Sequence, residues 1–211
     1  MNELPTPRIS QRKQAKQARS TELIAAILEA ATQVLAKEGA QRFTTARVAE
    51  KAGVSIGSLY QYFPNKAAIL FRLQSDEWRQ TGQMISAILG DLPTPPLERL
   101  RTLVRMFLHS ECEEAAMRIA LDDAAPLYRD APEAKQVRAS GERAVQRFMA
   151  EVLPEFPEDA RLMAGQLITT TLSTVGKQFS ETARSSAEID DYAAAMADML
   201  CAYLQQLRSN P

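Results

Sequence analysis

Residues Phe43 to Lys66, which read FTTARVAEKAGVSIGSLYQYFPNK, are the most informative segment of the sequence. Its residues predict two short helices joined by a tight turn. Thr44 is a good N-cap for the first helix, because its hydroxyl can accept a hydrogen bond from an N–H group of the first turn. Gly53 would end that helix with a positive φ angle, which costs glycine little.

The second helix would begin after another N-cap residue, Ser55, and Pro64 would end it. Leu59 and Phe63 would point inward. A helix, a glycine-containing turn and a second helix are typical of the helix-turn-helix motif, whose second helix enters the major groove of DNA. An ordinary helical hairpin with tyrosines on its surface is the alternative. Caps, turn and aromatic residues within one short window favour DNA binding.

The side chains that we expect on the outside of the second helix suit contacts with DNA. Gln61 can pair with the edge of adenine, and Ser58 with several bases. Ile56 offers an apolar contact to a thymine methyl group, Gly57 allows a close backbone approach, and tyrosine hydroxyls suit phosphate oxygens. The predicted DNA-binding residues are Thr44, Thr45, Ser55, Ile56, Gly57, Ser58, Tyr60, Gln61, Tyr62 and Lys66.

This stretch resembles the TetR family of bacterial transcription regulators over the first third of the chain; beyond that, the resemblance rests on length and helical character. The matching residues are Thr44-Thr45, Val48-Ala49, Ala52-Gly53-Val54-Ser55, Gly57-Ser58-Leu59-Tyr60, Tyr62-Phe63 and Asn65-Lys66. Ser58 stands where threonine is common, so the hydroxyl is kept. The resemblance implies phosphate contacts from Thr45, Tyr60, Tyr62 and Lys66. It places Ile56, Gly57, Ser58 and Gln61 beside base edges.

Length and composition limit the number of domains and the possible locations of the protein. The chain has 211 residues, 45% of them hydrophobic, which allows one or two domains with a substantial core. No apolar run approaches the ~20 residues of a membrane helix, and the polar, basic N-terminus predicts no signal peptide. Cys112 and Cys201 form neither a disulfide framework nor a metal motif. We therefore expect a soluble, reduced, cytoplasmic protein.

Charge is distributed unevenly along the chain. Residues 1–66 hold ten Lys/Arg and five Asp/Glu, whereas the remainder holds fifteen and twenty-one, which makes a net charge of −1. A basic N-terminal part followed by an acidic remainder indicates a polyanionic partner for the N-terminal part only. Residues 1–18 are polar and basic without apolar periodicity. They are predicted to be either an arm in the DNA minor groove or a solvated tail, and both interpretations stay open.

The rest of the sequence predicts helices and no strands, so the predicted fold class is all-α. We expect a three-helix helix-turn-helix domain followed by a larger helical domain for ligand binding and dimerisation. Apolar spacing and Gly or Pro breaks predict helices over residues 20–37, 66–89, from 97 to the break at Pro126, from 132, 158–182 and 187–207. The predicted organisation is an arm at 1–18, a DNA-binding domain at 19–66 and a regulatory domain at 67–211.

The last two predicted helices carry wider apolar arcs than one core contact needs. Paired with the same helices of a second subunit, residues 158–182 and 187–207 would form a four-helix interface. The alternative is that both faces are filled within one subunit. A homodimer is favoured because a small helix-turn-helix needs two half-sites for useful affinity.

A small-molecule cavity among the middle helices is a further prediction, because such sites combine apolar walls with a few polar groups. Each candidate taken singly is more often part of a core. A metal site is not expected, since His109 is the sole histidine, and no cofactor is predicted. The candidates are Trp78, Phe107, His109, Cys112, Met117, Tyr128, Phe148, Met149, Gln166, Thr169, Thr170 and Ser173.

The favoured function is a ligand-responsive transcription regulator, usually a repressor, that binds a palindromic operator as a homodimer. The resemblance implies that the helix starting at Lys66 transmits movement between the two domains. The alternative is a DNA-organising protein of the same fold without an effector. An enzyme is disfavoured, because the sequence shows no Gly-rich phosphate loop, nucleophile motif or paired histidines.

Overall fold

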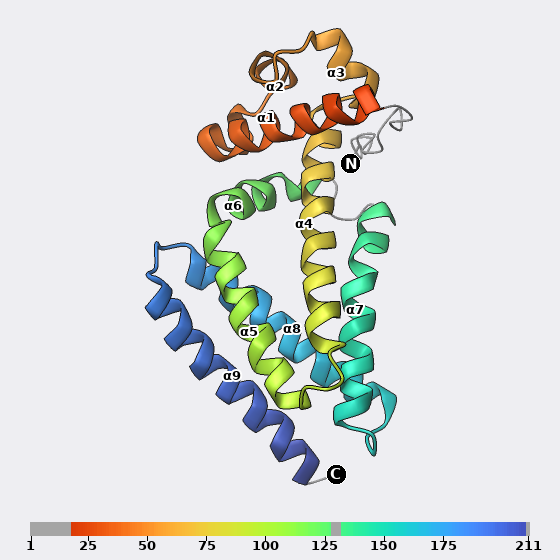
Figure 1. Cartoon of the computed structure of the whole chain (residues 1–211), viewed down its shortest axis with the longest axis vertical. Helices are drawn as coiled ribbons and strands as arrows, with labels where there is room; N and C mark the ends of the chain where they lie inside the picture. Colours follow the sequence, from red (N-terminus) through yellow and green to blue (C-terminus); the bar gives the residue numbers. More distant parts are fainter. Residues whose placement is uncertain (1–17, 128–131, 210–211) are drawn as a thin grey trace, which may run out of the picture. The chain divides into compact units, whose positions relative to one another are not determined.

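The computed structural model describes residues 18–127 and 132–209, and within these ranges the regular structure is entirely helical (Figure 1). The predicted all-α fold class is confirmed. In chain order the elements are α1 (Ala18–Arg42), α2 (Thr45–Lys51), α3 (Ile56–Tyr62), α4 (Lys66–Leu89), α5 (Pro96–Glu113), α6 (Ala115–Ala124), the 3₁₀ helix η1 (Ala125–Leu127), α7 (Pro132–Val152), α8 (Glu158–Ser180) and α9 (Ser186–Ser209).

The chain divides into two compact units. The first combines Met1–Glu77 with Ala116–Lys135, and the second combines Trp78–Ala115 with Gln136–Pro211. Helix α4 is one continuous helix with residues in both units. The functional boundaries expected at residues 18 and 66 stay predictions.

Local capping explains the helix-turn-helix. The Arg47 N–H donates to Thr44 Oγ1 at 3.3 Å, and the Ser58 N–H donates to Ser55 Oγ at 3.0 Å. Both predicted N-caps are thus confirmed. Between the helices Gly53 has a φ of 67°, in the left-handed region that only glycine enters at low cost. The turn therefore follows directly from the sequence.

The first unit has a core of branched and aromatic side chains. Ile27 and Leu35 of α1, Phe43 before α2, and Leu59 and Phe63 around α3 are all fully buried. Fully burying such a side chain stabilises the fold by roughly 1.5–3 kcal/mol. Phe43 and Phe63 are thus confirmed as the apolar base of the three-helix unit.

Helix boundaries agree with the sequence to within a few residues. Asn65 caps α4 by accepting a hydrogen bond from the Ala68 N–H at 2.9 Å. Gly39 interrupts α1 with a φ of 71°, as predicted, but a short helical segment continues to Arg42. Phe43 is buried directly after Arg42, so few residues remain for a loop between α1 and α2.

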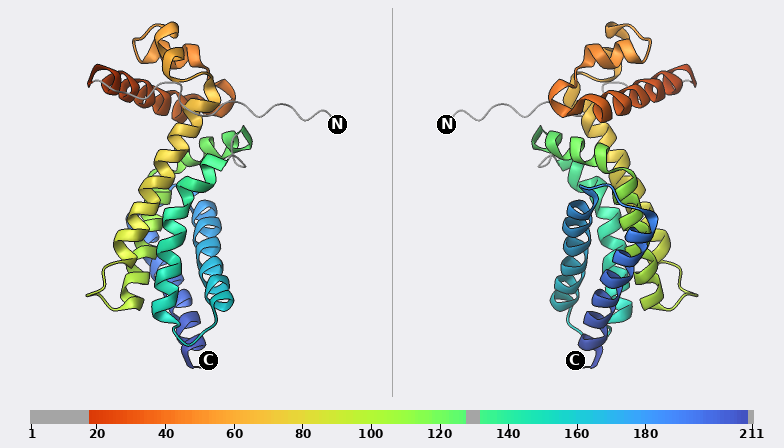
Figure 2. Two further views of the ribbon diagram at one scale, coloured as in Figure 1. Left: turned by 90° about the vertical axis from the view of Figure 1, so that its right-hand side faces the viewer. Right: turned by 90° about the vertical axis from the view of Figure 1, so that its left-hand side faces the viewer.

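The second unit is a helical bundle in which α5 packs against α8 and α9 (Figure 2). Its core draws on α4, α5, α7, α8 and α9. Polar contacts also tie α5 to α9. Arg105 Nε and His109 Nε2 both lie 2.9 Å from the same oxygen, Oδ1 of Asp190, and these hydrogen bonds lower the pKa of the Asp190 carboxyl.

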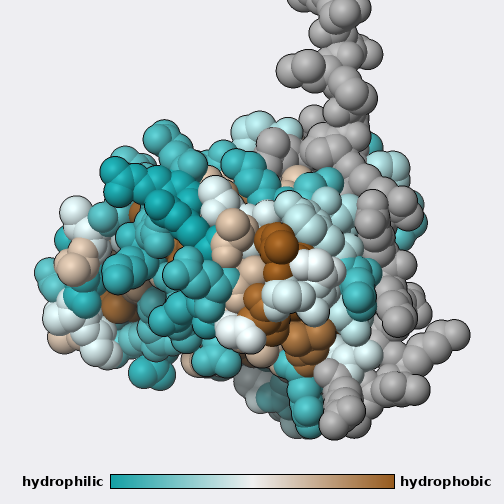
Figure 3. All heavy atoms as spheres, turned by 90° about the horizontal axis from the view of Figure 1, so that it is seen from above, coloured by the Kyte–Doolittle hydropathy of each residue, from teal (hydrophilic) through white to brown (hydrophobic). Residues whose placement is uncertain are grey.

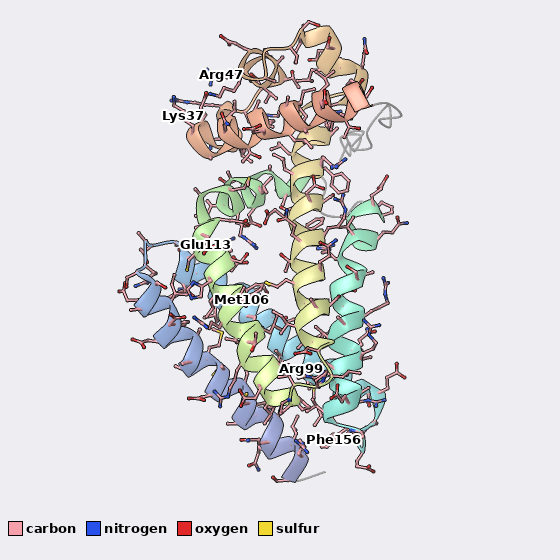
Figure 4. The ribbon with its side chains drawn as sticks, in the orientation of Figure 1. Lys37, Arg47, Arg99, Met106, Glu113 and Phe156 are labelled. Atoms are coloured by element: carbon pink, nitrogen blue, oxygen red, sulfur yellow. The ribbon has the colours of Figure 1, made fainter. Side chains whose placement is uncertain are left out.

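A buried arginine holds the end of α4. Arg99 has a relative exposure of 1%, and its guanidinium donates to the Leu89 carbonyl and to Glu151 of α7. The same group lies 5.5 Å from the centroid of the Phe148 ring. Figure 4 shows Arg99 near the start of α5. The carbonyl that the α4 terminus leaves without a helical partner is thereby satisfied.

Helices α4 and α7 make a close backbone approach at a pair of glycines. A Cβ atom added to Gly82 would lie 2.8 Å from Ser140 Oγ and 3.4 Å from the Gly141 nitrogen. A Cβ added to Gly141 would lie 3.5 Å from the Gly82 Cα. The absence of side chains at these two positions sets the separation of the helices.

The Arg99–Glu151 pair generates a stability prediction. Glu151→Ala leaves the buried guanidinium without its carboxylate, so we expect a loss of about 2–3 kcal/mol in the free energy of unfolding. Arg99→Met leaves a Glu151 side chain that is already 38% exposed and keeps an apolar stem, so the expected loss is about 1–2 kcal/mol. Urea titration of both variants tests this order, with exposed Glu155→Ala as control. A larger loss for Arg99→Met would contradict it.

Candidate functional site

The outer face of α3 presents the residues predicted to read bases. Ser55, Ile56, Gly57, Tyr60 and Gln61 are exposed, and Ser58 is half-buried. Ile56 has a relative exposure of 43%, which is high for a large apolar side chain. Figure 3, seen from above, shows a largely hydrophilic surface with a group of hydrophobic residues near the centre of the view. The expected exposure is thus confirmed for Ser55, Ile56, Gly57, Tyr60 and Gln61, and the contacts of these residues with DNA stay predictions.

Two contacts organise hydroxyl groups on this surface. Thr45 Oγ1 and Tyr60 Oη lie 3.1 Å apart, which joins the first turn of α2 to the exposed side of α3. Ser55 Oγ and Ser58 Oγ lie 2.8 Å apart. Hydroxyls donate and accept, so each pair keeps capacity for a phosphate or base. Lys66 is exposed in the first turn of α4.

Tyr62 is a correction to the sequence analysis, which expected an exposed side chain. It has a relative exposure of 5%, and its hydroxyl donates to Ser20 Oγ of α1 at 3.1 Å. The reason is helical spacing, since Tyr62 lies three residues after buried Leu59 and shares its inward face. A buried tyrosine hydroxyl usually finds a partner, and here the partner links α3 to the first turn of α1.

Basic residues that the sequence analysis did not select line a polar groove between α1 and α2. Arg47 pairs with Glu38 and also donates to the Arg42 carbonyl at 3.4 Å. Figure 4 shows Lys37 and Arg47 on these two helices. The groove lining is Gln33, Val34, Lys37, Glu38, Arg42, Arg47, Glu50 and Lys51. The basic composition of residues 1–66 was the available signal.

The second unit contains a cavity of about 500 Å³ between α4, α5, α7 and α8. Seven predicted residues line it: Trp78, Phe107, Phe148, Met149, Thr169, Thr170 and Ser173. The remaining lining residues are Thr81, Gly82, Ile85, Leu89, Leu100, Leu103, Arg138, Gly141, Glu142, Val145, Ile168 and Leu172. On α4 the sequence analysis selected Trp78 alone, although the apolar spacing that predicted this helix continues to Leu89.

Four other candidates lie outside this lining. His109 is bound to Asp190 of α9, and Gln166 is exposed on α8. Met117 belongs to α6 in the first unit. Cys112 is half-buried, and burial raises the pKa of its thiol, which disfavours the reactive thiolate. Tyr128 lies outside the described residues.

Polar groups are few in the cavity wall. Thr169 Oγ1 donates to the Gly165 carbonyl at 2.9 Å, and Ser173 Oγ donates to the Thr170 carbonyl at 3.2 Å. Both hydroxyl hydrogens therefore stay within α8. Arg138 lies over the indole of Trp78, with its guanidinium carbon 4.9 Å from the ring centroid. Aliphatic and aromatic side chains supply most of the remaining lining.

The described residues meet the requirements of neither a metal site nor a membrane-spanning helix. In residues 18–127 and 132–209, no cluster of three or more His, Cys, Asp or Glu side chains is placed to hold a metal ion. Among the helices that the structure describes, none has the length and apolar character needed to cross a membrane.

Comparison with known proteins decides the family. Residues 27–73 match the model described as bacterial regulatory proteins, tetR family, and residues 95–207 match the tetracyclin repressor-like C-terminal domain. The chain belongs to the TetR family. It is therefore a helix-turn-helix transcriptional regulator, and the resemblance drawn from Phe43 to Lys66 is confirmed.

Individual proteins and solved structures to which this TetR-family chain is similar include regulators and a nucleoid occlusion factor. It is 31% identical to the nucleoid occlusion factor SlmA of Vibrio atlanticus over 152 residues, covering 67% of this chain and 76% of that protein. The fatty acid degradation regulator FadR of Bacillus halodurans superposes with a TM-score of 0.68 at 20% identity, covering 89% and 97% of the two chains. FadR of Bacillus subtilis in complex with stearoyl-CoA gives 0.65 at 16%, covering 84% and 97%. These two structures share the fold.

The two tyrosines of α3 generate a matched prediction. Tyr60→Phe removes an exposed hydroxyl and its contact with Thr45, so we expect a stability loss of only about 0.5 kcal/mol. We also expect a several-fold loss of DNA affinity, because the predicted phosphate contact is lost. Tyr62→Phe removes the bond to Ser20, so we expect a loss of about 1 kcal/mol in stability with DNA affinity retained.

Urea titration and fluorescence anisotropy with labelled DNA measure the two effects. A Tyr62→Phe variant of full stability that has lost DNA affinity would show that the buried hydroxyl serves DNA binding after all.

Proposed function

We propose that this TetR-family regulator is a ligand-responsive repressor that binds a palindromic operator as a homodimer. The observation that carries the proposal is the course of α4. This continuous helix begins four residues after the end of α3, and its residues from Trp78 to Leu89 line the cavity. An occupant of the cavity would therefore contact the same helix that follows the DNA-binding motif.

The DNA contacts proposed here divide by chemistry. Gln61, Ser58 and Ile56 supply base-edge contacts from the exposed face of α3, while Gly57 allows close approach. Thr45, Tyr60 and Lys66 supply phosphate contacts, which position the protein without reading sequence. Thr44 and Ser55 act first as caps, and their place at the helix starts brings them to the same surface. Tyr62 acts through its support of α1.

A homodimer through α8 and α9 is supported by large apolar side chains that stay exposed in one subunit. Met163 and Leu167 of α8 have relative exposures of 63% and 50%, and Met199 of α9 has 54%. On α8, Met163 and Leu167 are one turn apart and lie opposite buried Ile168 and Leu172. Tyr192 of α9 extends this surface. Exposed apolar patches of this kind mark interfaces, and a twofold axis would repeat the patch on both subunits.

Ligand response is supported by the size and composition of the cavity, which lie in the range typical of small-molecule sites. A ligand that fits one arrangement of α4 better than another shifts the population toward that arrangement. In the proposed mechanism the ligand-bound arrangement changes the separation of the two α3 helices and weakens operator binding. No catalytic step is involved, and the site of action is the bacterial chromosome in the cytoplasm.

A DNA-organising function without an effector is the second candidate. The observation that favours it is the likeness to nucleoid occlusion factors across two thirds of the chain. Such a protein would use the same surface of α3 but would not require a ligand in the cavity.

Selection of genomic fragments with the purified protein, followed by footprinting at two salt concentrations, tests the proposal. We expect a footprint of twofold symmetry at a few sites, with affinity that falls as salt rises. Binding without preferred sites would contradict sequence-specific regulation. Sites spread over the chromosome, with no regulated gene beside them, would favour the organising function.

The base and phosphate roles can be separated on the selected operator. Gln61→Ala should change preference at one base position by about 1–3 kcal/mol, because one pairing is lost. Lys66→Ala should weaken binding to every operator variant and reduce the salt dependence. Anisotropy titrations over a set of singly substituted operators measure both. An equal loss on all operators for Gln61→Ala would remove its role as a base reader.

The dimer interface has a matched test of its own. Leu167→Glu and Met199→Glu place a charge in the proposed interface, so we expect each variant to be monomeric at concentrations where the wild type is dimeric. Met106→Glu is the control, because Met106 of α5 is 47% exposed and lies outside the proposed interface. Sedimentation velocity distinguishes the states. Dissociation by Met106→Glu alone would place the interface elsewhere.

A further inference from the structure

One end of the cavity carries a cation, Arg138, to which the described residues supply no carboxylate partner. Arg138 of α7 is half-buried, and its contact is the face of Trp78, 4.9 Å from guanidinium carbon to ring centroid. The part of the chain that the structure describes places no carboxylate within ion-pair distance of Arg138. Stacking covers one face of the guanidinium and leaves the N–H groups at its edge free. A partly desolvated cation with free donors favours an anion.

The cavity is long because its walls follow two helices in parallel. The contacts Trp78–Arg138 and Gly82–Gly141 occur in the same order along α4 and α7, and Leu89 and Phe148 follow in the lining. From Trp78 to Leu89 the axis of α4 rises about 16 Å. The lining residues on α4 therefore extend over about three helical turns, which suits a chain-like molecule.

The other end of the cavity is apolar. Leu89, Leu100 and Phe148 line it, and the nearby guanidinium of Arg99 is already bound to Leu89 and Glu151. Along the α8 wall, Thr169 and Ser173 donate to their own helix, so they offer acceptors and no free hydrogen to an anion. Positive charge is thus confined to the Trp78–Arg138 end.

We propose that the cavity binds an elongated amphipathic anion. Its carboxylate or equivalent head group meets the Arg138 guanidinium beside Trp78, and its hydrocarbon tail lies along α4 toward Leu89 and Phe148. This inference rests on the proposed role of the cavity as the ligand site and adds the chemical class and orientation of the ligand.

Glu142 is the residue that argues for a cationic ligand instead. It also lines the cavity, one turn after Arg138 on α7, but its side chain is exposed whereas Arg138 is half-buried. Water screens an exposed carboxylate, so its field inside the cavity is weaker than that of the partly buried guanidinium. The charge preference of the site therefore follows Arg138.

The test uses compounds that share one chain and differ in the head group. Dodecanoate, dodecanol and dodecylammonium, each below its micelle concentration, compete with the neutral fluorescent probe N-phenyl-1-naphthylamine for the full-length protein. The melting temperature is measured in parallel with each compound. Three variants are compared with the wild type: Arg138→Gln, Glu142→Gln and, as a matched control on the exposed side of α7, Arg143→Gln.

For the wild type we expect dodecanoate to displace the probe at about tenfold lower concentration than dodecanol, because one charge-assisted contact is gained. Dodecylammonium should be the weakest competitor. Arg138→Gln should abolish the advantage of dodecanoate and leave dodecanol unchanged, which a general loss of structure would not do. Arg143→Gln and Glu142→Gln should keep the advantage.

Two results would overturn the inference, and they separate it from the proposed function. If dodecanol or dodecylammonium binds as well as dodecanoate, the cavity still takes ligands but the assigned class is wrong. If no compound displaces the probe or shifts the melting temperature, both the class and the role of the cavity are wrong. Operator footprinting then stands as an independent measure of DNA binding.

Discussion

The proposed link between the cavity and the DNA-binding motif depends on α4 being one continuous helix from Lys66 to Leu89. Asn65 caps the first turn of the helix, and Arg99 holds the last carbonyl, that of Leu89. Between these points the helix has no proline and one glycine, Gly82, which is buried rather than exposed to solvent. A helix that is fixed at both ends transmits displacement better than a frayed one, because local unfolding cannot absorb it.

The feature that distinguishes a ligand-responsive regulator from a DNA-organising protein is the cavity, not α3. Regulators and nucleoid-binding proteins can share a recognition helix, since the exposed hydroxyls, glutamine and lysine serve either purpose. The second unit holds a cavity with a stacked Trp78–Arg138 pair at one end and hydrocarbon at the other. Partial desolvation of the Arg138 charge costs stability, and the proposed anionic ligand would offset this cost when it is bound.

The sequence predicted the helix-turn-helix well because its determinants are local. Caps at Thr44 and Ser55, the positive φ at Gly53 and the stop before Pro64 act within a few residues. Tyr62 was misjudged although its spacing from buried Leu59 is local, because the partner that satisfies its buried hydroxyl, Ser20, lies far away in the chain. The cavity was predicted only in part for the same reason: Arg138 and Gly141 are polar or small residues with no periodic signal. Their importance appears only when α4 and α7 are placed together.

The close approach of Gly82 and Gly141 gives the cavity an adjustable wall. The spacing of α4 and α7 is set where two side chains are missing, at Gly82 and Gly141, which are themselves part of the cavity lining. A family member with one added methyl group at this crossing would change the width of the cavity and leave the other lining residues in place. Differences in cavity width among family members would then arise from the helix crossing of α4 and α7 rather than from the large side chains of the lining.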